Sequence, residues 1–237
     1  MRTLSIFHLP RHTYCITPAM KLLILIFSLF ILTNSSYSQE WETVKIDSTV
    51  SVKLPKGFNK TDKNDKYSLV AVSPWGTILI FKTLDDEMST PDIEKNKHLK
   101  KYYDDYIKNV RTVSPGAIIN DEKDGKIGAL NVKDFTLQID TGSGILFRNF
   151  RLLHASNATY IFEFLYQDLH SEFAVPEKEK FFNSIEVNEQ LDRSDQYTSD
   201  EINDNNAASK KYLYWAIPGG IVLIGFAFFL LQKRNRT

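Results

Sequence analysis

Cysteine is nearly absent from this chain of 237 residues, because the only one is Cys15, close to the N-terminus. Cys15 lies in a segment that we expect to be removed, so the mature protein can form no internal disulfide. Cys15 also precedes the first apolar run, which excludes it as the lipid-bearing cysteine of a lipoprotein. The folded part of the chain must therefore be held together by a hydrophobic core alone.

The chain also lacks an excess of basic residues, with 29 Lys and Arg against 29 Asp and Glu. Three basic residues fall within residues 1–38 and three within the tail 232–237, and neither segment holds an acid. The remainder is therefore acidic by six charges. Nucleic-acid binding depends on clustered Lys and Arg that face phosphates, so we expect no nucleic acid as a partner.

No motif of catalysis or zinc binding is present. Beyond residue 38 the histidines are His98, His154 and His170, and their spacing fits no zinc site. We expect them at unrelated surface positions, on a helix, at a strand end and in a loop. Ser143 lies in the sequence TGSG, which lacks the full G-x-S-x-G pattern of a nucleophile turn. The sequence therefore predicts no catalytic residue, no cofactor and no enzyme activity.

One acidic cluster has the chemistry of a cation site. It consists of Asp85, Asp86, Glu87, Asp92 and Glu94. Calcium takes several oxygen ligands from one loop, but this cluster lacks the alternating ligands and the turn glycine of an EF-hand. A solvated loop followed by acids at a helix N-terminus explains the same residues. We therefore predict no metal, with calcium binding as the alternative.

The N-terminal segment, residues 1–38, is typical of a presequence with a signal peptide. Met20 is the natural start, since Lys21 and an apolar run from Leu22 to Leu32 follow it directly. A small-x-small site places cleavage after Ser38. The alternative is an N-terminal anchor that is retained.

Near the C-terminus, residues 212–231 carry no charge and are long enough for about 30 Å of helix, the thickness of a bilayer core. We predict a single transmembrane helix there, followed by a basic cytoplasmic tail at 232–237. Residues 188–211 are acidic and poor in large apolar side chains, so we expect a flexible linker. With a signal peptide in front, residues 39–187 would form a domain outside the cytoplasm and the C-terminus would lie inside.

Most of residues 39–187 show strand patterns. We expect strands at 44–46, 50–54, 67–72, 78–81, 117–121, 127–139, 144–154 and 159–166. The last four are separated by short turns at Asp124-Gly125, Thr141-Gly142-Ser143 and Ser156-Asn157, so they should pair as antiparallel hairpins. The aromatic side chains of the last strand are expected in the core, with a ligand cleft as the alternative.

Two helices complete this region. The first is expected over residues 91–110, capped by Ser89 or Thr90 and with Pro91 in its first turn. The second is short and opens at Pro176. The first helix should pack on the sheet through one apolar stripe, which comprises Leu99, Tyr103, Tyr106, Ile107 and Val110.

This order of elements resembles the PsbP-like family over about residues 41–187. The likeness rests on VKLPKGF at 52–58, the apolar strand TILIFK, three long meandering strands with aromatics at Tyr160 to Phe164, and the closing FFNSI at 181–185. The resemblance implies an α+β fold, an α/β/α sandwich around an antiparallel sheet shared with the Ran-binding nuclear import factor. Characterised members mostly bind partners, and no family binding residue can be transferred to this sequence.

The sequence predicts a single-pass membrane protein that presents a binding or accessory module to another envelope protein and touches the bilayer through residues 212–231. The alternative is a small-molecule carrier or enzyme with a pocket between sheet and helix. A large pocket with convergent polar groups would favour the alternative, whereas a filled core with an exposed apolar patch would favour the module.

Overall fold

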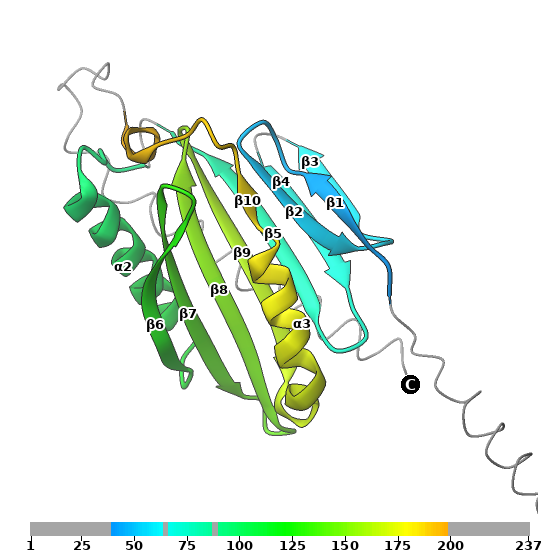
Figure 1. Ribbon diagram of the computed structural model, residues 1–237. Helices are drawn as coiled ribbons and strands as arrows, with labels where there is room; N and C mark the ends of the chain where they lie inside the picture. The colour runs from blue at the N-terminus through cyan, green and yellow to red at the C-terminus, as the bar shows by residue number, and fades with distance from the viewer. Residues whose placement is uncertain (1–38, 64–65, 87–89, 199–237) are drawn as a thin grey trace, which may run out of the picture. The chain divides into compact units, whose positions relative to one another are not determined.

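The computed structural model describes residues 39–63, 66–86 and 90–198. Their main element is a seven-stranded antiparallel sheet in the order β3-β4-β5-β9-β8-β7-β6 (Figure 1). The pairing of β5 with β9 joins two runs of neighbouring hairpins into one sheet. The strands are β3 (Asn59–Lys63), β4 (Lys66–Val72), β5 (Thr77–Leu84), β6 (Ile118–Ile127), β7 (Leu130–Asp140), β8 (Ile145–Ala155) and β9 (Ala158–Gln167).

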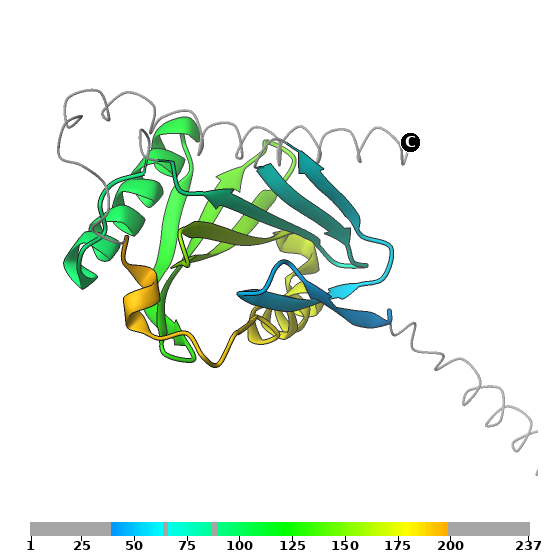
Figure 2. The same cartoon turned by 90° about the horizontal axis from the view of Figure 1, so that it is seen from above.

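Different elements cover the two faces of this sheet (Figure 2). Helix α2 (Asn96–Val113) packs on one face. Helix α3 (Ser171–Asn183) packs on the other face, together with a small antiparallel sheet ordered β1-β2-β10. That sheet consists of β1 (Trp41–Lys45), β2 (Val50–Pro55) and β10 (Glu186–Val187). The described residues thus form the mixed α+β fold with antiparallel sheets that the sequence predicts.

Side chains on both faces of strand β9 are buried in the core. Tyr160, Phe162 and Phe164 are buried in the cluster beneath α3 and the small sheet, whereas Ile161 and Leu165 are buried in the cluster beneath α2. Alternate side chains of a strand point to opposite faces, so one period-two run serves both layers. The aromatic side chains of β9 therefore lie in the core, as expected from the sequence, and not in a ligand cleft.

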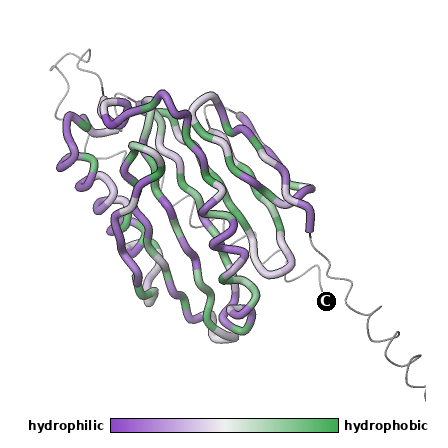
Figure 3. The backbone as a smooth tube through the Cα atoms, in the orientation of Figure 1, coloured by the Kyte–Doolittle hydropathy of each residue, from purple (hydrophilic) through white to green (hydrophobic). Residues whose placement is uncertain are grey.

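Helix α2 is held by its stripe. Figure 3 shows α2 as mainly hydrophilic, yet all five predicted stripe residues are buried against the sheet. Its start was predicted wrongly, because the helix begins at Asn96 after Lys95, with no side-chain cap. The preceding residues instead insert Ile93 fully into the core, and Ile93 exchanges two hydrogen bonds with Thr198 at 2.8 and 3.0 Å. Burial of Ile93 thus replaces the first predicted turns of helix.

The turn between β6 and β7 also differs from the prediction. Asp124 and Gly125 lie inside β6, where Gly125 pairs with Val132, and the turn falls at Gly128-Ala129. Gly128 has a φ of 58°, a left-handed conformation that suits glycine in a tight turn. The predicted turns at Thr141-Gly142-Ser143 and Ser156-Asn157 are confirmed.

Pro176 does not open the last helix, because α3 starts at Ser171, directly after the 3₁₀ turn η1 (Asp168–His170). Proline has no backbone N–H to donate to the carbonyl four residues earlier, which here belongs to Glu172. Glu172 and Pro176 are both exposed, so water can satisfy that carbonyl and the helix passes through.

Residues 188–198 fold onto the large sheet, whereas the sequence assigned them to a flexible linker. They include a second 3₁₀ turn, η2 (Arg193–Gln196), whose Gln196 is fully buried. The Gln196 amide donates to the carbonyls of Asn131 and His154 and accepts from the Asn131 N–H. Polar side chains dominate this stretch, but these bonds offset its lack of apolar surface. The rest of the predicted linker lies outside the described residues.

None of the helices in residues 39–63, 66–86 and 90–198 has the length and apolar character to cross a bilayer. The predicted presequence 1–38 and the predicted membrane helix 212–231 both lie outside these ranges.

Candidate functional site

The candidate residues from the sequence are scattered. His98 lies on α2 and His170 in η1, but His154 is fully buried in β8, so its predicted surface position was wrong. Ser143 lies in the exposed β7–β8 turn. In the described parts of the chain, no three His, Cys, Asp or Glu side chains are grouped to hold a metal ion, and Glu87 falls outside those parts.

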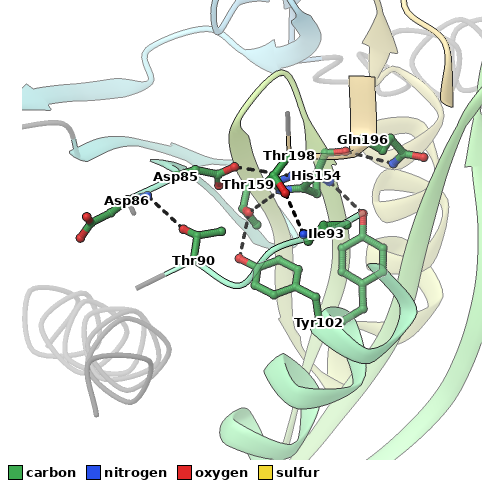
Figure 4. Close-up of polar contacts among 10 residues, drawn as sticks. Asp85, Asp86, Thr90, Ile93, Tyr102, His154, Thr159, Gln196 and Thr198 are labelled. Atoms are coloured by element: carbon green, nitrogen blue, oxygen red, sulfur yellow. Dashed lines mark hydrogen bonds and ion pairs between the residues drawn. The ribbon is translucent and has the colours of Figure 1, made fainter. Parts of the chain in front are cut away.

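A buried polar row lies beneath α2, at the end of the sheet where β5 stops and β9 begins (Figure 4). The Thr159 hydroxyl lies 2.9 Å from the Tyr102 hydroxyl and 3.1 Å from Nδ1 of His154. On the other side of the ring, Nε2 of His154 lies 3.6 Å from Oδ2 of Asp85. Neither of these last two atoms has a hydrogen-bond partner among the described residues.

Burial shifts both titrating groups of this row toward their neutral forms. It raises the pKa of Asp85 to about 6 and lowers the pKa of His154 to about 4. A hydroxyl, an imidazole and a carboxylate in series would suit nucleophilic catalysis if a substrate could reach the hydroxyl. Thr159 and His154 are both buried, so we assign the row to the core and not to a reaction centre.

A polar cleft of about 390 Å³ lies on the opposite face of the sheet, between β6–β8 and the last turns of α3. Its walls carry both signs of charge, so it has no strong preference for an anion or a cation. The residues that line it are Asp121, Glu122, Lys123, Asp134, Phe135, Thr136, Asn149, Phe150, Arg151, Lys178, Glu179, Phe182 and Asn183.

Arg151 lines this cleft, and its guanidinium makes three hydrogen bonds within the protein. Its guanidinium donates to both carboxylate oxygens of Asp134 at 2.8 Å and to the carbonyl of Phe182 at 2.9 Å. A paired Arg151 ties α3 to the sheet and offers little free charge to a ligand.

The third feature is an exposed group of apolar side chains at the end of the sheet remote from the polar row. We call Val72, Trp75, Leu169 and Phe173 the aromatic patch. Their exposed fractions are 38%, 38%, 74% and 52%, and the rings of Trp75 and Phe173 stack at 4.6 Å. His170 meets the Trp75 ring edge-on at 5.8 Å. The patch thus joins the β4–β5 turn to η1 and the first turn of α3.

The turn that carries Trp75 is locked in place. The Ser73 hydroxyl accepts from the Gly76 N–H at 3.0 Å and donates to Glu177 of α3 at 2.6 Å, while the Ser73 N–H donates to the Gly76 carbonyl at 2.9 Å. A Cβ on Gly76 would lie 2.5 Å from the Phe164 ring and 2.8 Å from the Leu165 carbonyl, so only glycine fits there. Trp75 is therefore held at the surface and cannot fold inward without breaking this turn.

Sequence reasoning missed the patch, although part of its signal was present. Trp75 stands between Pro74 and Gly76, and such residues mark turns, where a large aromatic side chain has little chance of burial. Phe173 gave no such signal, because the start of α3 was placed too late.

No family model matches the sequence, and no curated protein does either. Several solved structures are distantly similar to this chain, including the three that follow. A protein of unknown function from Pseudomonas aeruginosa, PA94, described as a putative regulator, shares 12% identity at a TM-score of 0.37, covering 60% of this chain and 92% of that one.

The other two are comparably distant. A protein from Bacteroides thetaiotaomicron shares 12% identity at a TM-score of 0.36, covering 60% of this chain and 46% of that one. LpqN of Mycobacterium tuberculosis, involved in cell envelope biogenesis, shares 11% identity at a TM-score of 0.38, covering 62% of this chain and 90% of that one.

Proposed function

We propose that this chain is a single-pass membrane protein whose folded domain lies outside the cytoplasm and docks another envelope protein. The aromatic patch is the observation that carries this proposal. Six large hydrophobic side chains are exposed among the described residues, and four of them form the patch. Trp75 and Phe173 are in direct contact, and exposed apolar side chains that gather in this way mark interaction sites in soluble domains.

The position of the patch supports docking of a partner far from the point where the folded domain is attached to the membrane helix. The described chain ends at Thr198, whose N–H donates to Ile93 at the polar-row end of the sheet, whereas the patch lies at the other end. Residues 199–211, as a flexible coil, would span roughly 20 Å. A strand as long as β8 spans roughly 35 Å more, so a partner could reach the patch without displacing the membrane anchor.

We propose in addition that this domain has the PsbP-like fold. The resemblance to the PsbP-like family is supported by the order of the elements, with the FFNSI segment closing α3 against the core. Phe181 is fully buried and Ile185 nearly so, as that closing position requires.

The test uses the full-length chain extracted from the membranes of cells that produce it. A double variant, Trp75→Ala with Phe173→Ala, removes the stacked pair, and Ile118→Ala removes an exposed apolar side chain outside the patch. We expect one protein to copurify with the wild type and with Ile118→Ala, and to be lost from the double variant. Equal recovery from all three would refute docking through the patch.

The polar cleft favours a second candidate, a carrier or enzyme for a small polar ligand. Its 390 Å³ volume is at the lower end of ligand pockets, and Asn149 and Thr136 are buried in its floor. Against this candidate, those two side chains bond each other at 3.1 Å and Arg151 is paired with Asp134. A ligand would have to compete with bonds already made, so the patch is the stronger site.

A further inference from the structure

The charges around the aromatic patch point to the chemistry of its partner. The segment from Asp168 to Glu177 carries three acids and no Lys or Arg, and the β4–β5 turn from Val72 to Gly76 carries no charge. Asp168 and Glu172 are exposed, and neither has a salt-bridge partner among the described residues. The first basic residue of α3, Lys178, lines the polar cleft.

We propose that the aromatic patch binds a polypeptide segment of the partner that combines apolar side chains with lysine or arginine. This inference rests on the proposed docking function and adds the chemistry of the partner. Apolar side chains would cover Trp75 and Phe173, while the basic groups would lie over Asp168 and Glu172. Rim charges of this kind add specificity and speed of association, whereas the buried aromatics supply most of the affinity.

The rigid turn strengthens the inference. Binding costs less when the recognising side chains are already ordered. The Ser73 bonds to Gly76 and Glu177 fix Trp75 before any partner arrives. The same acidic rim disfavours an anionic lipid surface, so a polypeptide is a better occupant than the bilayer.

The experiment uses the full-length chain in nanodiscs of zwitterionic lipid, with empty nanodiscs as the blank. Three fluorescent peptides of equal length serve as probes: one of leucine and lysine, one with glutamate for lysine, and one with serine for leucine. Anisotropy titrations give the dissociation constants. We expect the leucine–lysine peptide to bind at least about tenfold more tightly than the other two, and more weakly as salt is added.

Variants then locate the binding. Trp75→Ala should raise the dissociation constant of the leucine–lysine peptide by at least about tenfold, whereas Ile118→Ala should leave it unchanged. Reversing the rim with Asp168→Lys and Glu172→Lys should transfer the preference to the leucine–glutamate peptide. Both changes lie on exposed side chains, so the fold should survive them.

The outcomes separate the two proposals. Equal affinity for the lysine and glutamate peptides, both lost in Trp75→Ala, would overturn the partner chemistry and leave the docking surface standing. Peptide binding that is unchanged in Trp75→Ala would overturn both the partner chemistry and the docking surface. Failure of all three peptides to bind up to about 1 mM would overturn the partner chemistry.

Two other occupants are tested with the same protein. Trp75-dependent self-association, measured as mass by light scattering, would assign the patch to a second copy of the chain. Quenching of Trp75 by brominated lipid, in a variant with Trp41 and Trp215 replaced by Phe, would assign it to the bilayer. Either result would overturn the proposal.

Discussion

Arg148 and Glu163 form an ion pair that is closed off from solvent beneath α2, with side-chain exposures of 2% and 0%. Two hydrogen bonds join the groups, of which Nη2 to Oε2 measures 2.9 Å. Burial lowers the pKa of Arg148, but the charge of Glu163 more than offsets this and leaves that pKa raised. The neighbouring strands β8 and β9 hold the two groups together.

Glu163→Gln should therefore be severely destabilising, because it leaves the guanidinium buried without a counter-charge. We expect a loss of about 3–5 kcal/mol in the free energy of unfolding. Denaturant titration of the full-length chain in detergent micelles measures it. The control is Lys101→Ala, which breaks an exposed pair with Asp105 and should cost less than about 0.5 kcal/mol. Similar losses in the two variants would show that the Arg148 environment is wet.

Asp85→Asn should stabilise the protein, and more so as pH rises. Burial raises the pKa of Asp85 to about 6 from 3.8, so the folded state holds this proton more tightly than the unfolded state. The stability that the proton provides is complete below about pH 4 and is lost as pH rises through 6. The gain from Asp85→Asn should thus grow by about 2–3 kcal/mol between pH 4 and pH 7.

His154, in the same polar row, has the opposite effect on how stability depends on pH. Burial lowers its pKa to about 4, so it costs stability as pH falls below 6.5. Comparing Asp85→Asn with the wild type at each pH removes most of this contribution, since both proteins keep a buried His154. Glu189→Gln, at an exposed position, serves as the control and should stay within about 0.5 kcal/mol of the wild type at every pH. A constant gain for Asp85→Asn would contradict the assigned shift.

Ile107→Ala should destabilise the protein by about 2–5 kcal/mol, because Ile107 lies mid-stripe on α2 with 5% of its surface exposed. Lys100→Ala, on the exposed side of the same helix, should stay within about 0.5 kcal/mol of neutral. Urea titration of the full-length chain in micelles compares them. Equal effects would show that α2 does not depend on its stripe.

Gln196→Ala should loosen residues 188–198 from the sheet. The buried amide makes three bonds to Asn131 and His154, and its removal leaves backbone groups unpaired at a cost of about 1–3 kcal/mol. Limited proteolysis of the full-length chain should show faster cleavage within this stretch. Gln190→Ala, at an exposed position, should leave the cleavage rate as it is. Unchanged cleavage in Gln196→Ala would mean that other contacts hold the stretch.

Periodic patterns predicted most of the fold. The alternation in β2 and β9 and the stripe on α2 identified residues that the structure buries. The predicted ends of helices and strands were wrong where a tertiary contact competed with a local sequence signal. Thr90 and Pro91 suit a helix start, but burying Ile93 against Thr198 excludes a helix there. Local sequence does not report such a contact, because the two residues are far apart in the chain.

The candidate site was less predictable for the same reason. Trp75 and Phe173 lie on different elements, and their stacking depends on how the β4–β5 turn meets α3. The buried row had a similar origin, since Asp85 and His154 come together only when β5 and β9 pair. Charge and hydropathy patterns describe single segments, so neither cluster could be assembled from them.

Contact between the aromatic patch and a partner protein can be measured by site-specific photo-crosslinking in intact cells that produce the full-length chain. A photoreactive phenylalanine analogue replaces Trp75 in one variant and Ile118 in a matched one, both exposed in the structure. We expect one discrete protein adduct from position 75 and none from position 118. An equal pattern from the two positions, or adducts with lipid alone at position 75, would contradict it.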